Sequence, residues 1–338
     1  MTIFRYFRED YDNQSKTNAY LCSLLSYYVY DDLSAGVVEM NFEDRFANTM
    51  STLRPEDDPF TVTHYSGNSV DQFPFDTECI VVNNQRVAIV VFRGTEGIPI
   101  LSDNGNTVSS LRDWLTNLQF PITNPSDLDR AGVHLGFWGA LNTVYNSLRT
   151  GLRELVESNP NIRIFFTGHS LGGALATLCA FRMQKKVDEI SVSGVYTFGA
   201  PRVGNHVFLT LYQNTFISSG VTLWDRTWRW VNNADLVPQF FKHEPFFARI
   251  GNLTPNPLET YYHVGEQNFI RANGSVELNR PWSDSNDDAG LRASSGADHS
   301  MSYMCRRMYR RLRTDDRESP NSPDWLVKDD VIAVRSIW

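Results

Sequence analysis

Residues 162–176 constrain the fold more than any other part of this 338-residue chain. They form a short apolar run, then Gly-His-Ser-Leu-Gly, then small residues that suit a helix. A sharp turn between a strand and a helix strains the backbone at Ser170, and Gly168 and Gly172 have no Cβ to obstruct it. The pattern therefore predicts a strand–turn–helix elbow that presents an exposed serine hydroxyl.

The elbow also suggests chemistry. A serine hydroxyl is a weak nucleophile that needs an adjacent base. The helix that starts after Ser170 directs backbone N–H groups toward the same place, which suits a developing negative charge. The pentapeptide alone is a weak signal, because glycine and serine are common residues. The apolar run before it and Ala-Leu-Ala after it favour the elbow. We therefore expect nucleophilic chemistry at Ser170.

The segments around the elbow alternate between strand and helix patterns. This alternation predicts an α/β fold with a mostly parallel central sheet flanked by helices. The apolar residues 87–92 suit a central strand, because both of their faces are hydrophobic. After residue 238 we expect two strands that pair with each other, near 260–265 and 268–270, and then a surface loop. The other elements expected are helices at 18–30, 132–155, 171–183 and 205–214, and strands at 79–82, 162–167, 190–198 and 227–233.

Composition limits the partners and the compartment. The net charge of -8 argues against nucleic acid as a partner. No apolar run is long enough for a transmembrane segment. Residues 1–10 lack the apolar core of a signal peptide, so we expect a protein that is cytoplasmic, exported by another route or shown without its leader. The four cysteines are scattered and show no zinc pattern. The nucleophilic chemistry expected at Ser170 needs neither a metal nor a cofactor.

A reactive serine needs a histidine base. In folds built on this elbow the chain order is serine, acid, histidine. His299 opens a helix after a long loop, and we prefer it as the base because catalytic residues concentrate on loops. His263 is the next candidate, although a structural role suits its expected strand position. His206 precedes the preferred acid, and His243 lies in an irregular stretch.

The base needs a carboxylate that orients it. Asp235 follows an apolar-aromatic strand directly, which places it at the carboxyl edge of the sheet, where sites form. Asp225 precedes that strand, at the wrong end. Asp298 adjoins His299, but sequence neighbours on a helix do not face each other. We therefore expect Asp235 to be the acid.

Two features follow the strand at 87–92. Thr95 lies just past it, where its N–H and hydroxyl can donate to an oxyanion, although a plain loop threonine fits the position as well. Further on, Leu111 and Leu115 share one helix face, with Trp114 beside them. This helix either packs on the core or forms a mobile lid over an apolar cleft, and its place after Thr95 favours the lid.

Taken together, these motifs resemble a known family. The motifs stand at 92–95, 168–174, 198–205, 232–238 and 298–299. They occur in the order found in class 3 lipases, the fungal-type triacylglycerol lipases of the α/β-hydrolase fold. The resemblance covers roughly residues 18–303. It implies that Ser170 is the nucleophile, Asp235 the acid and His299 the base, with Thr95 and the backbone N–H of Leu171 as the oxyanion hole.

The same resemblance implies the organisation of the chain. It implies one α/β-hydrolase domain over residues 1–338, with a lid at about 96–118, an insertion at about 271–297 and a C-terminal extension at about 314–338. Trp114 is similar to the lid tryptophan of the fungal enzymes, and His263 resembles a structural histidine near the site.

The function expected on this basis is that of a serine carboxylester hydrolase, in the first place a triacylglycerol lipase. Its substrate would be a lipid or another ester, met at a lipid–water interface. A phospholipase A1 or a feruloyl-type esterase would use the same machinery. A non-catalytic lipid-binding protein on the same scaffold is an alternative of another class, and the presence of serine, aspartate and histidine argues against it.

Overall fold

The structure is a computed structural model, and its described residues fall in several stretches. They are 7–10, 14–30, 60–67, 77–94, 122–187, 189–233, 235, 237–239, 261–271, 275–280, 299–301, 304–305 and 307–308.

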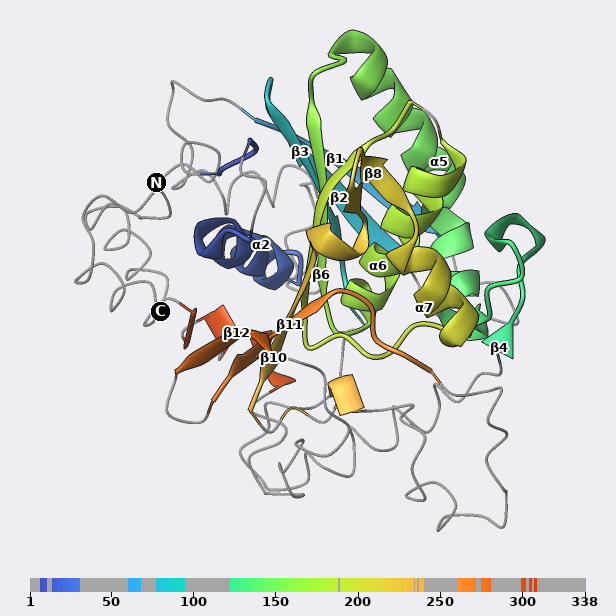
Figure 1. Cartoon of the computed structure of the whole chain (residues 1–338). Helices are drawn as coiled ribbons and strands as arrows, with labels where there is room; N and C mark the ends of the chain where they lie inside the picture. The colour runs from blue at the N-terminus through green and yellow to red at the C-terminus, as the bar shows by residue number, and fades with distance from the viewer. Residues whose placement is uncertain are drawn as a thin grey trace.

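An eight-stranded sheet forms the centre of these stretches (Figure 1). In spatial order the strands are β1 (Thr61–Gly67), β2 (Thr77–Asn83), β3 (Val87–Phe92), β6 (Arg163–His169), β7 (Val192–Phe198), β10 (Thr227–Asn232), β11 (Glu266–Ile270) and β12 (Val276–Arg280). The five neighbours β3, β6, β7, β10 and β11 pair in parallel, and the pairs at both edges are antiparallel. Because parallel strands end at the same edge of a sheet, the turns after β3, β6, β7 and β10 lie close together.

Helices cover both faces of this sheet (Figure 1). One face carries α2 (Lys16–Tyr28), and the other carries α5 (Leu135–Ser158), α6 (Leu171–Lys186) and α7 (His206–Gln213). The remaining elements are the short strands β4 (Ile122–Thr123), β5 (Val133–His134), β8 (Phe216–Ser218) and β9 (Val221–Thr222) and the 3-10 helices η2 (Ser126–Leu128), η3 (Trp224–Arg226) and η4 (Val237–Gln239).

Strand β3 shows why helices must cover both faces of the sheet. Successive side chains of a strand point to opposite faces. Val90 and Phe92 belong to the core under α5 and α6, whereas Ile89 and Val91 belong to the core under α2. All four are fully buried, and burial of a side chain of this size stabilises a fold by roughly 1.5–3 kcal/mol. The expectation that residues 87–92 form a central strand is confirmed.

The core under α2 also receives the described residues near the carboxyl end of the chain. Met301, Met304, Cys305 and Met308 are buried in it, although Cys305 lies 282 positions after Ser23 of α2. The Cys305 thiol lies 3.4 Å from the Ser23 carbonyl oxygen. The segment that begins at His299 therefore rests on the first described helix.

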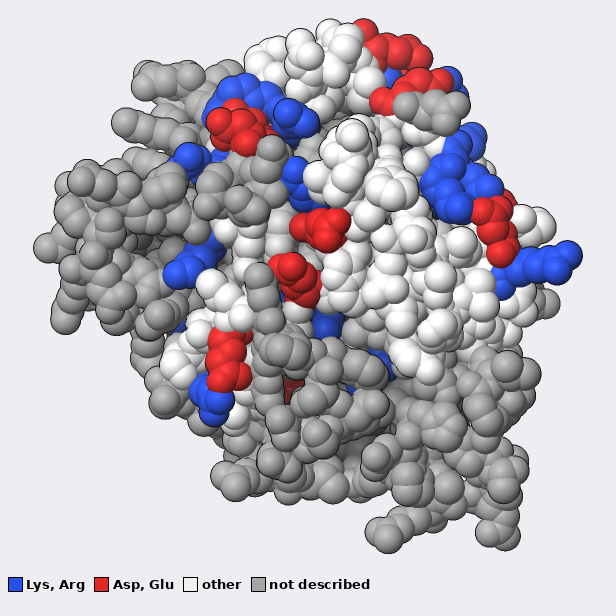
Figure 2. Space-filling model, viewed as in Figure 1, with Lys and Arg blue, Asp and Glu red and all other residues white. Residues whose placement is uncertain are grey.

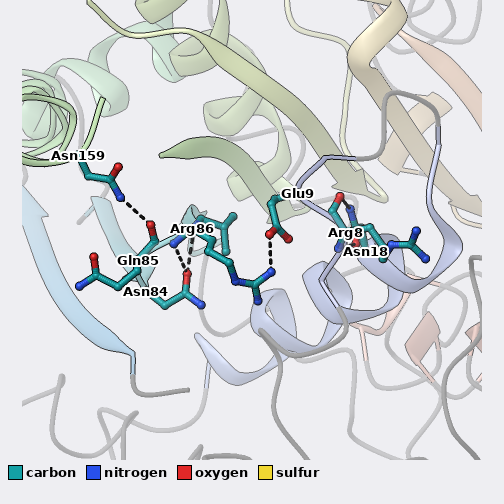
Figure 3. A network of polar contacts seen from close by, with 8 residues as sticks. Arg8, Glu9, Asn18, Asn84, Gln85, Arg86 and Asn159 are labelled. Atoms are coloured by element: carbon teal, nitrogen blue, oxygen red, sulfur yellow. Dashed lines mark hydrogen bonds and ion pairs between the residues drawn. The ribbon is translucent and has the colours of Figure 1, made fainter. Parts of the chain in front are cut away.

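A polar network joins the amino-terminal stretch to α2 and to the β2–β3 turn (Figure 3). The Arg8 N–H donates to Asn18 Oδ1 at 2.8 Å, and Asn18 Nδ2 donates to the Arg8 carbonyl at 2.9 Å. Glu9 forms an ion pair with Arg86 of the turn. Such partly exposed pairs add little stability individually, but these contacts fix where α2 lies on the sheet.

Two expectations about the chain after β10 were wrong. Residues 261–265, the described part of the first expected strand, do not form a strand: Tyr262 makes only an isolated bridge to Gly204, and β11 begins at Glu266 and pairs in parallel with β10. Gly265 adopts φ +83, which interrupts an extended chain at this point. The expected surface loop contains β12, an edge strand whose polar composition fits its partial exposure.

The surface view shows charges of both signs (Figure 2). On this face the coloured side chains stand in small mixed groups beside a broad uncharged area over α6 and α7. Within the described ranges, no helix combines the length and the apolar character that crossing a membrane requires.

Gly265 allows a test of the turn that sets the register of β11. A Cβ at this position would lie 2.5 Å from the Thr227 carbonyl oxygen and 2.6 Å from the Thr227 Cβ. Gly220 has a similar φ of +76, but a Cβ there meets nothing within 4 Å. We expect Gly220→Ala to lower the free energy of unfolding by about 1 kcal/mol through backbone strain alone, and Gly265→Ala by about 3 kcal/mol or more through strain and overlap. Urea unfolding measures both, and equal losses would contradict the overlap.

Candidate active site

The elbow lies between β6 and α6. Ser170 follows β6 directly and has φ 55 and ψ -126, a backbone region that residues other than glycine rarely occupy. Such strain costs of order 1–3 kcal/mol and persists only where the surroundings enforce it. Here the Ser170 N–H donates to the Phe198 carbonyl of β7 at 2.9 Å, so the turn is tied to the neighbouring strand.

Close packing explains the small residues of the elbow. A Cβ at Gly168 would overlap the carbonyl group of Gly172, and one at Gly172 would lie 2.9 Å from the Phe92 carbonyl carbon. A Cβ at Gly173 would lie 2.7 Å from the Ala200 Cβ. The elbow therefore sits against the ends of both β3 and β7.

The structure brings Ser170, His299 and Asp235 together. His299 Nε2 lies 2.9 Å from Ser170 Oγ, and His299 Nδ1 lies 2.9 Å from Asp235 Oδ1. A carboxylate can only accept, so the proton of His299 is on Nδ1, and Nε2 accepts from the serine hydroxyl. The imidazole is thus in the tautomer in which it can take the serine proton.

The expectation of an exposed serine was wrong for this structure. Ser170 is 2% exposed, and His299 and Asp235 are fully buried. The reason lies in the packing, because the elbow fills the space between two strand ends and the His299 ring lies against the hydroxyl. Burial strengthens the hydrogen bonds of the three side chains, since little water competes with them.

Asp235 is held by the turn after β10. Its N–H donates to the Asn232 carbonyl at 3.0 Å, and its Oδ1 accepts from the Val237 N–H at 3.0 Å as well as from His299. The carboxylate is therefore fixed by backbone groups before it meets the imidazole. This agrees with the expected position at the carboxyl edge of the sheet.

Gly199 leaves the space in which the aspartate and histidine meet. It follows β7 with φ +55, and a Cβ there would lie 2.6 Å from Asp235 Oδ2 and 3.1 Å from His299 Nδ1. Sequence reasoning placed this glycine in a motif but gave it no role. Its backbone approaches the pair so closely that no side chain fits.

His263 lies beside the segment that follows Asp235. Among the hydrogen bonds of the described residues, none joins His263 to His299 or to Ser170. Its Nε2–H donates to the Pro238 carbonyl at 2.7 Å, and Arg202 Nη1 donates to the same oxygen at 2.9 Å. Burial, and then the nearby Arg229 and Arg202, hold the pKa of His263 well below its usual 6.5. The ring is therefore neutral and supports the segment that follows Asp235.

The other candidates lie apart from the three side chains or outside the described residues. His206 is an exposed residue at the start of α7, and Asp225 accepts from the Thr222 N–H and hydroxyl at 2.8 Å in an exposed turn. The candidates outside the described residues are Thr95, Leu111, Trp114, Leu115, His243 and Asp298.

Leu171, the other expected oxyanion residue, is the first residue of α6. First-turn amides of a helix have no acceptor within it, and they carry the positive end of the helix dipole. The Leu171 amide is adjacent to Ser170 and suits an anion. Among the described residues, no group of three or more histidine, cysteine, aspartate or glutamate side chains could hold a metal ion.

The part of the chain around this site matches a known protein family. Residues 89–244, which include the elbow and Asp235, match the family described as Lipase (class 3). This stretch belongs to the class 3 lipase family. The resemblance drawn from the sequence motifs is thereby confirmed.

Curated relatives of this class 3 lipase region include fungal and plant proteins. A lipase of Rhizomucor miehei is 30% identical over 204 residues, 59% of this chain and 46% of the relative. The secreted mono- and diacylglycerol lipase A of Penicillium cyclopium is 36% identical over 110 residues, 32% of this chain and 35% of the relative. A chloroplastic phospholipase A(1) of Arabidopsis thaliana is 30% identical over 154 residues, 41% of this chain and 32% of the relative. The chain spans less than half the length of these relatives.

Solved lipase structures share the fold. Lipase II from Rhizopus niveus aligns with a TM-score of 0.58 at 20% identity, covering 83% of this chain and 91% of that one. The triacylglyceride lipase of Rhizomucor miehei aligns with a TM-score of 0.56 at 22% identity, covering 85% and 94%. The fold is that of the α/β-hydrolases, with the mostly parallel sheet that the strand and helix patterns predicted.

Sequence reasoning missed one contact of this site. His169 Nε2 lies 2.7 Å from the His299 carbonyl oxygen, and the two rings are 4.6 Å apart. His169 was treated only as the variable residue of the elbow pentapeptide. A long-range contact to a backbone carbonyl leaves no trace in local sequence, so no pattern could have revealed it.

Gly199→Ala tests whether the space between β7 and the acid is required. We expect kcat for a carboxylic ester to fall by about 100-fold or more, because the new methyl group displaces Asp235 and His299 from their hydrogen-bonded positions. Gly220→Ala, which carries the same kind of strain in open space, should keep the wild-type rate. Steady-state kinetics on both folded variants decides, and an active Gly199→Ala enzyme would show that the close approach is unimportant.

Buried neutral histidines should make the fold sensitive to acid. Burial holds the pKa of both His169 and His263 well below 6.5. Below about pH 6.5 the unfolded chain binds protons at these residues and the folded chain does not, so stability falls as the pH falls through this window, by up to about 1.4 kcal/mol per pH unit for each histidine. Urea unfolding between about pH 7.5 and about pH 5.5 measures the slope.

His263→Gln is the matched variant for that measurement, because its amide can still donate to the Pro238 carbonyl while it no longer titrates. The slope of free energy against pH should be shallower in this variant. An unchanged slope would mean that His263 binds its proton equally in the folded and unfolded chains.

Proposed function

We propose that this chain is a serine carboxylester hydrolase that cleaves acylglycerol esters through an acyl-enzyme. The observation that carries the proposal is the unbroken line Ser170–His299–Asp235, with 2.9 Å at each of its two hydrogen bonds. A solved structure at 23% identity and a TM-score of 0.56 is described as a triacylglycerol lipase with a serine protease triad at its catalytic centre. That description supports the same assignment for these three side chains.

The first half of the proposed reaction forms the acyl-enzyme. Ser170 Oγ attacks the ester carbonyl carbon while His299 Nε2 takes the hydroxyl proton. Asp235 accepts the hydrogen bond of the imidazolium and stabilises its charge. The carbonyl oxygen becomes an oxyanion beside the amide of Leu171, and Thr95 would supply the second donor. Each such donor is worth roughly 3 kcal/mol of transition-state stabilisation.

The second half releases the products. His299 gives its proton to the glycerol oxygen as the ester C–O bond breaks, and the alcohol leaves. Water then attacks the acyl carbonyl while His299 takes one of its protons. Collapse of this second tetrahedral intermediate returns that proton to Ser170 Oγ and releases the fatty acid. Each proton passes through the same imidazole nitrogen.

The names of the relatives support an acylglycerol substrate. The Penicillium cyclopium relative is named a mono- and diacylglycerol lipase, and the Rhizomucor miehei relative a lipase. Phospholipase A1 activity is the second candidate, because a relative at 30% identity is named for it. We infer action at a lipid–water interface from the lid pattern of Leu111, Trp114 and Leu115 in the sequence.

Ser170→Ala tests the nucleophile. A fluorophosphonate, which phosphonylates reactive serines, should label the wild-type chain and not this variant, and ester hydrolysis should fall by about 10³-fold or more. Ser147→Ala is the matched control, because Ser147 is an exposed serine on α5 whose hydroxyl donates only to its own helix, at the Val144 carbonyl. Labelling that persists in Ser170→Ala would refute the assignment.

The substrate class is resolved in the same assay with a triglyceride, a diglyceride, phosphatidylcholine and methyl ferulate. The acylglycerols should be hydrolysed fastest, with a rise in rate once the substrate aggregates. Faster hydrolysis of phosphatidylcholine would favour phospholipase A1 activity, and equal rates below and above aggregation would argue against a lid.

A further inference from the structure

A second line of hydrogen bonds runs behind His299. His169 Nε2 lies 2.7 Å from the His299 carbonyl oxygen, and His169 Nδ1 lies 3.2 Å from the Tyr30 hydroxyl. The three residues come from distant parts of the chain: Tyr30 follows α2, His169 ends β6, and His299 lies 130 positions after His169. The described stretches thus converge on the backbone of the residue that the proposed reaction uses as its base.

The direction of each hydrogen bond in this line follows from its partners. A carbonyl oxygen only accepts, so His169 carries a proton on Nε2. Burial, and then the neighbouring His299, hold the pKa of His169 well below 6.5, so the ring is neutral and Nδ1 accepts. Tyr30 must therefore donate its hydroxyl proton, and burial raises its pKa so that it stays protonated.

The line lies against the end of β3. A Cβ at Gly94 would overlap the Tyr30 hydroxyl. Both donors of the line point the same way, from Tyr30 through His169 to the His299 carbonyl. Because His169 precedes Ser170 in the chain, the line connects the elbow to the backbone of the base.

We propose that Tyr30 and His169 are positioning residues that hold the backbone of His299 so that its ring bridges Ser170 and Asp235. This inference rests on the proposed function, because it explains how that site is kept in register. The side chain of His299 is held at both ring nitrogens. The His169 N–H, at the end of the central strand β6, holds its backbone carbonyl as well.

The ring packing supports the same role. The His169 and His299 rings lie 4.6 Å apart with an angle of 34° between their planes, and the Tyr30 and His169 rings meet edge to face at 5.9 Å. Loss of the His169 donor would leave the His299 carbonyl without this buried partner and let the segment shift. A displacement of about 1 Å at a reacting group can lower a rate about 100-fold.

Tyr30→Phe is the first test, because it removes one hydroxyl and keeps the ring. Tyr212→Phe is its control: Tyr212 is a buried tyrosine away from the site, and its hydroxyl lies 2.8 Å from Thr227 Oγ1 in the core under α7. We expect Tyr30→Phe to lower kcat for a short soluble ester about 3- to 10-fold, the equivalent of one neutral hydrogen bond, with KM unchanged within about twofold. Tyr212→Phe should lose comparable thermal stability and keep kcat.

His169→Gln and His169→Leu form the second test. Glutamine can still present an N–H to the His299 carbonyl, whereas leucine cannot. We expect His169→Leu to lose about 100-fold in kcat and His169→Gln to retain most of the wild-type rate. The downfield proton resonance of the His299–Asp235 hydrogen bond should persist in His169→Gln and broaden in His169→Leu. A purely structural role would leave this resonance and the kcat of folded variants unchanged.

Two outcomes would overturn the inference. One is a wild-type kcat in Tyr30→Phe, which decides the matter even if His169→Leu fails to fold. The other is a glutamine variant that is as impaired as the leucine variant while both are folded. Fluorophosphonate labelling of the wild-type chain at Ser170 separates this result from the proposed function: an unlabelled wild type refutes both, whereas a labelled wild type with an unaffected Tyr30→Phe refutes the positioning role alone.

Discussion

The strained backbone of Ser170 is the constraint on which the rest of the site depends. A residue with φ 55 and ψ -126 relaxes unless its neighbours prevent it, and here the neighbours are the ends of two strands. The Ser170 amide is tied to Phe198, and Gly172 packs on Phe92, so β3 and β7 both enforce the turn. These strands can do so only because the sheet is parallel at its centre, so that their carboxyl ends lie on either side of the end of β6.

The same edge of the sheet gathers the other groups. The turn after β7 provides Gly199, and the turn after β10 provides Asp235, so the acid and the space for it come from adjacent strands. His299 alone arrives from outside the strand order. Its ring is held by Ser170 and Asp235, and its carbonyl is held by His169. The proposed base is thus supported both by the site and by the strand beneath it.

Much of this arrangement could be predicted from the sequence because it is encoded locally. The elbow glycines, the apolar strand at 87–92 and the aspartate after an aromatic strand each follow from steric or periodic rules. The strand at 266–270 was expected only over 268–270 and with another partner, because the polar residues Glu266 and Gln267 hide its start and its parallel pairing with β10 is non-local. Tyr30 and His169 escaped for the same physical reason, since contacts between residues 139 and 130 positions apart have no local signature.

The packing of Met301, Met304 and Cys305 bears on the order in which the site is completed during synthesis. Met301, Met304 and Cys305 pack in the core that α2 shares with the sheet, so the place that receives His299 is built from residues near the start of the chain. A ribosome would produce that place first, the serine and the aspartate next, and the imidazole only after another 64 residues. On the proposed mechanism, a nascent chain would remain hydrolytically silent until synthesis has passed residue 299.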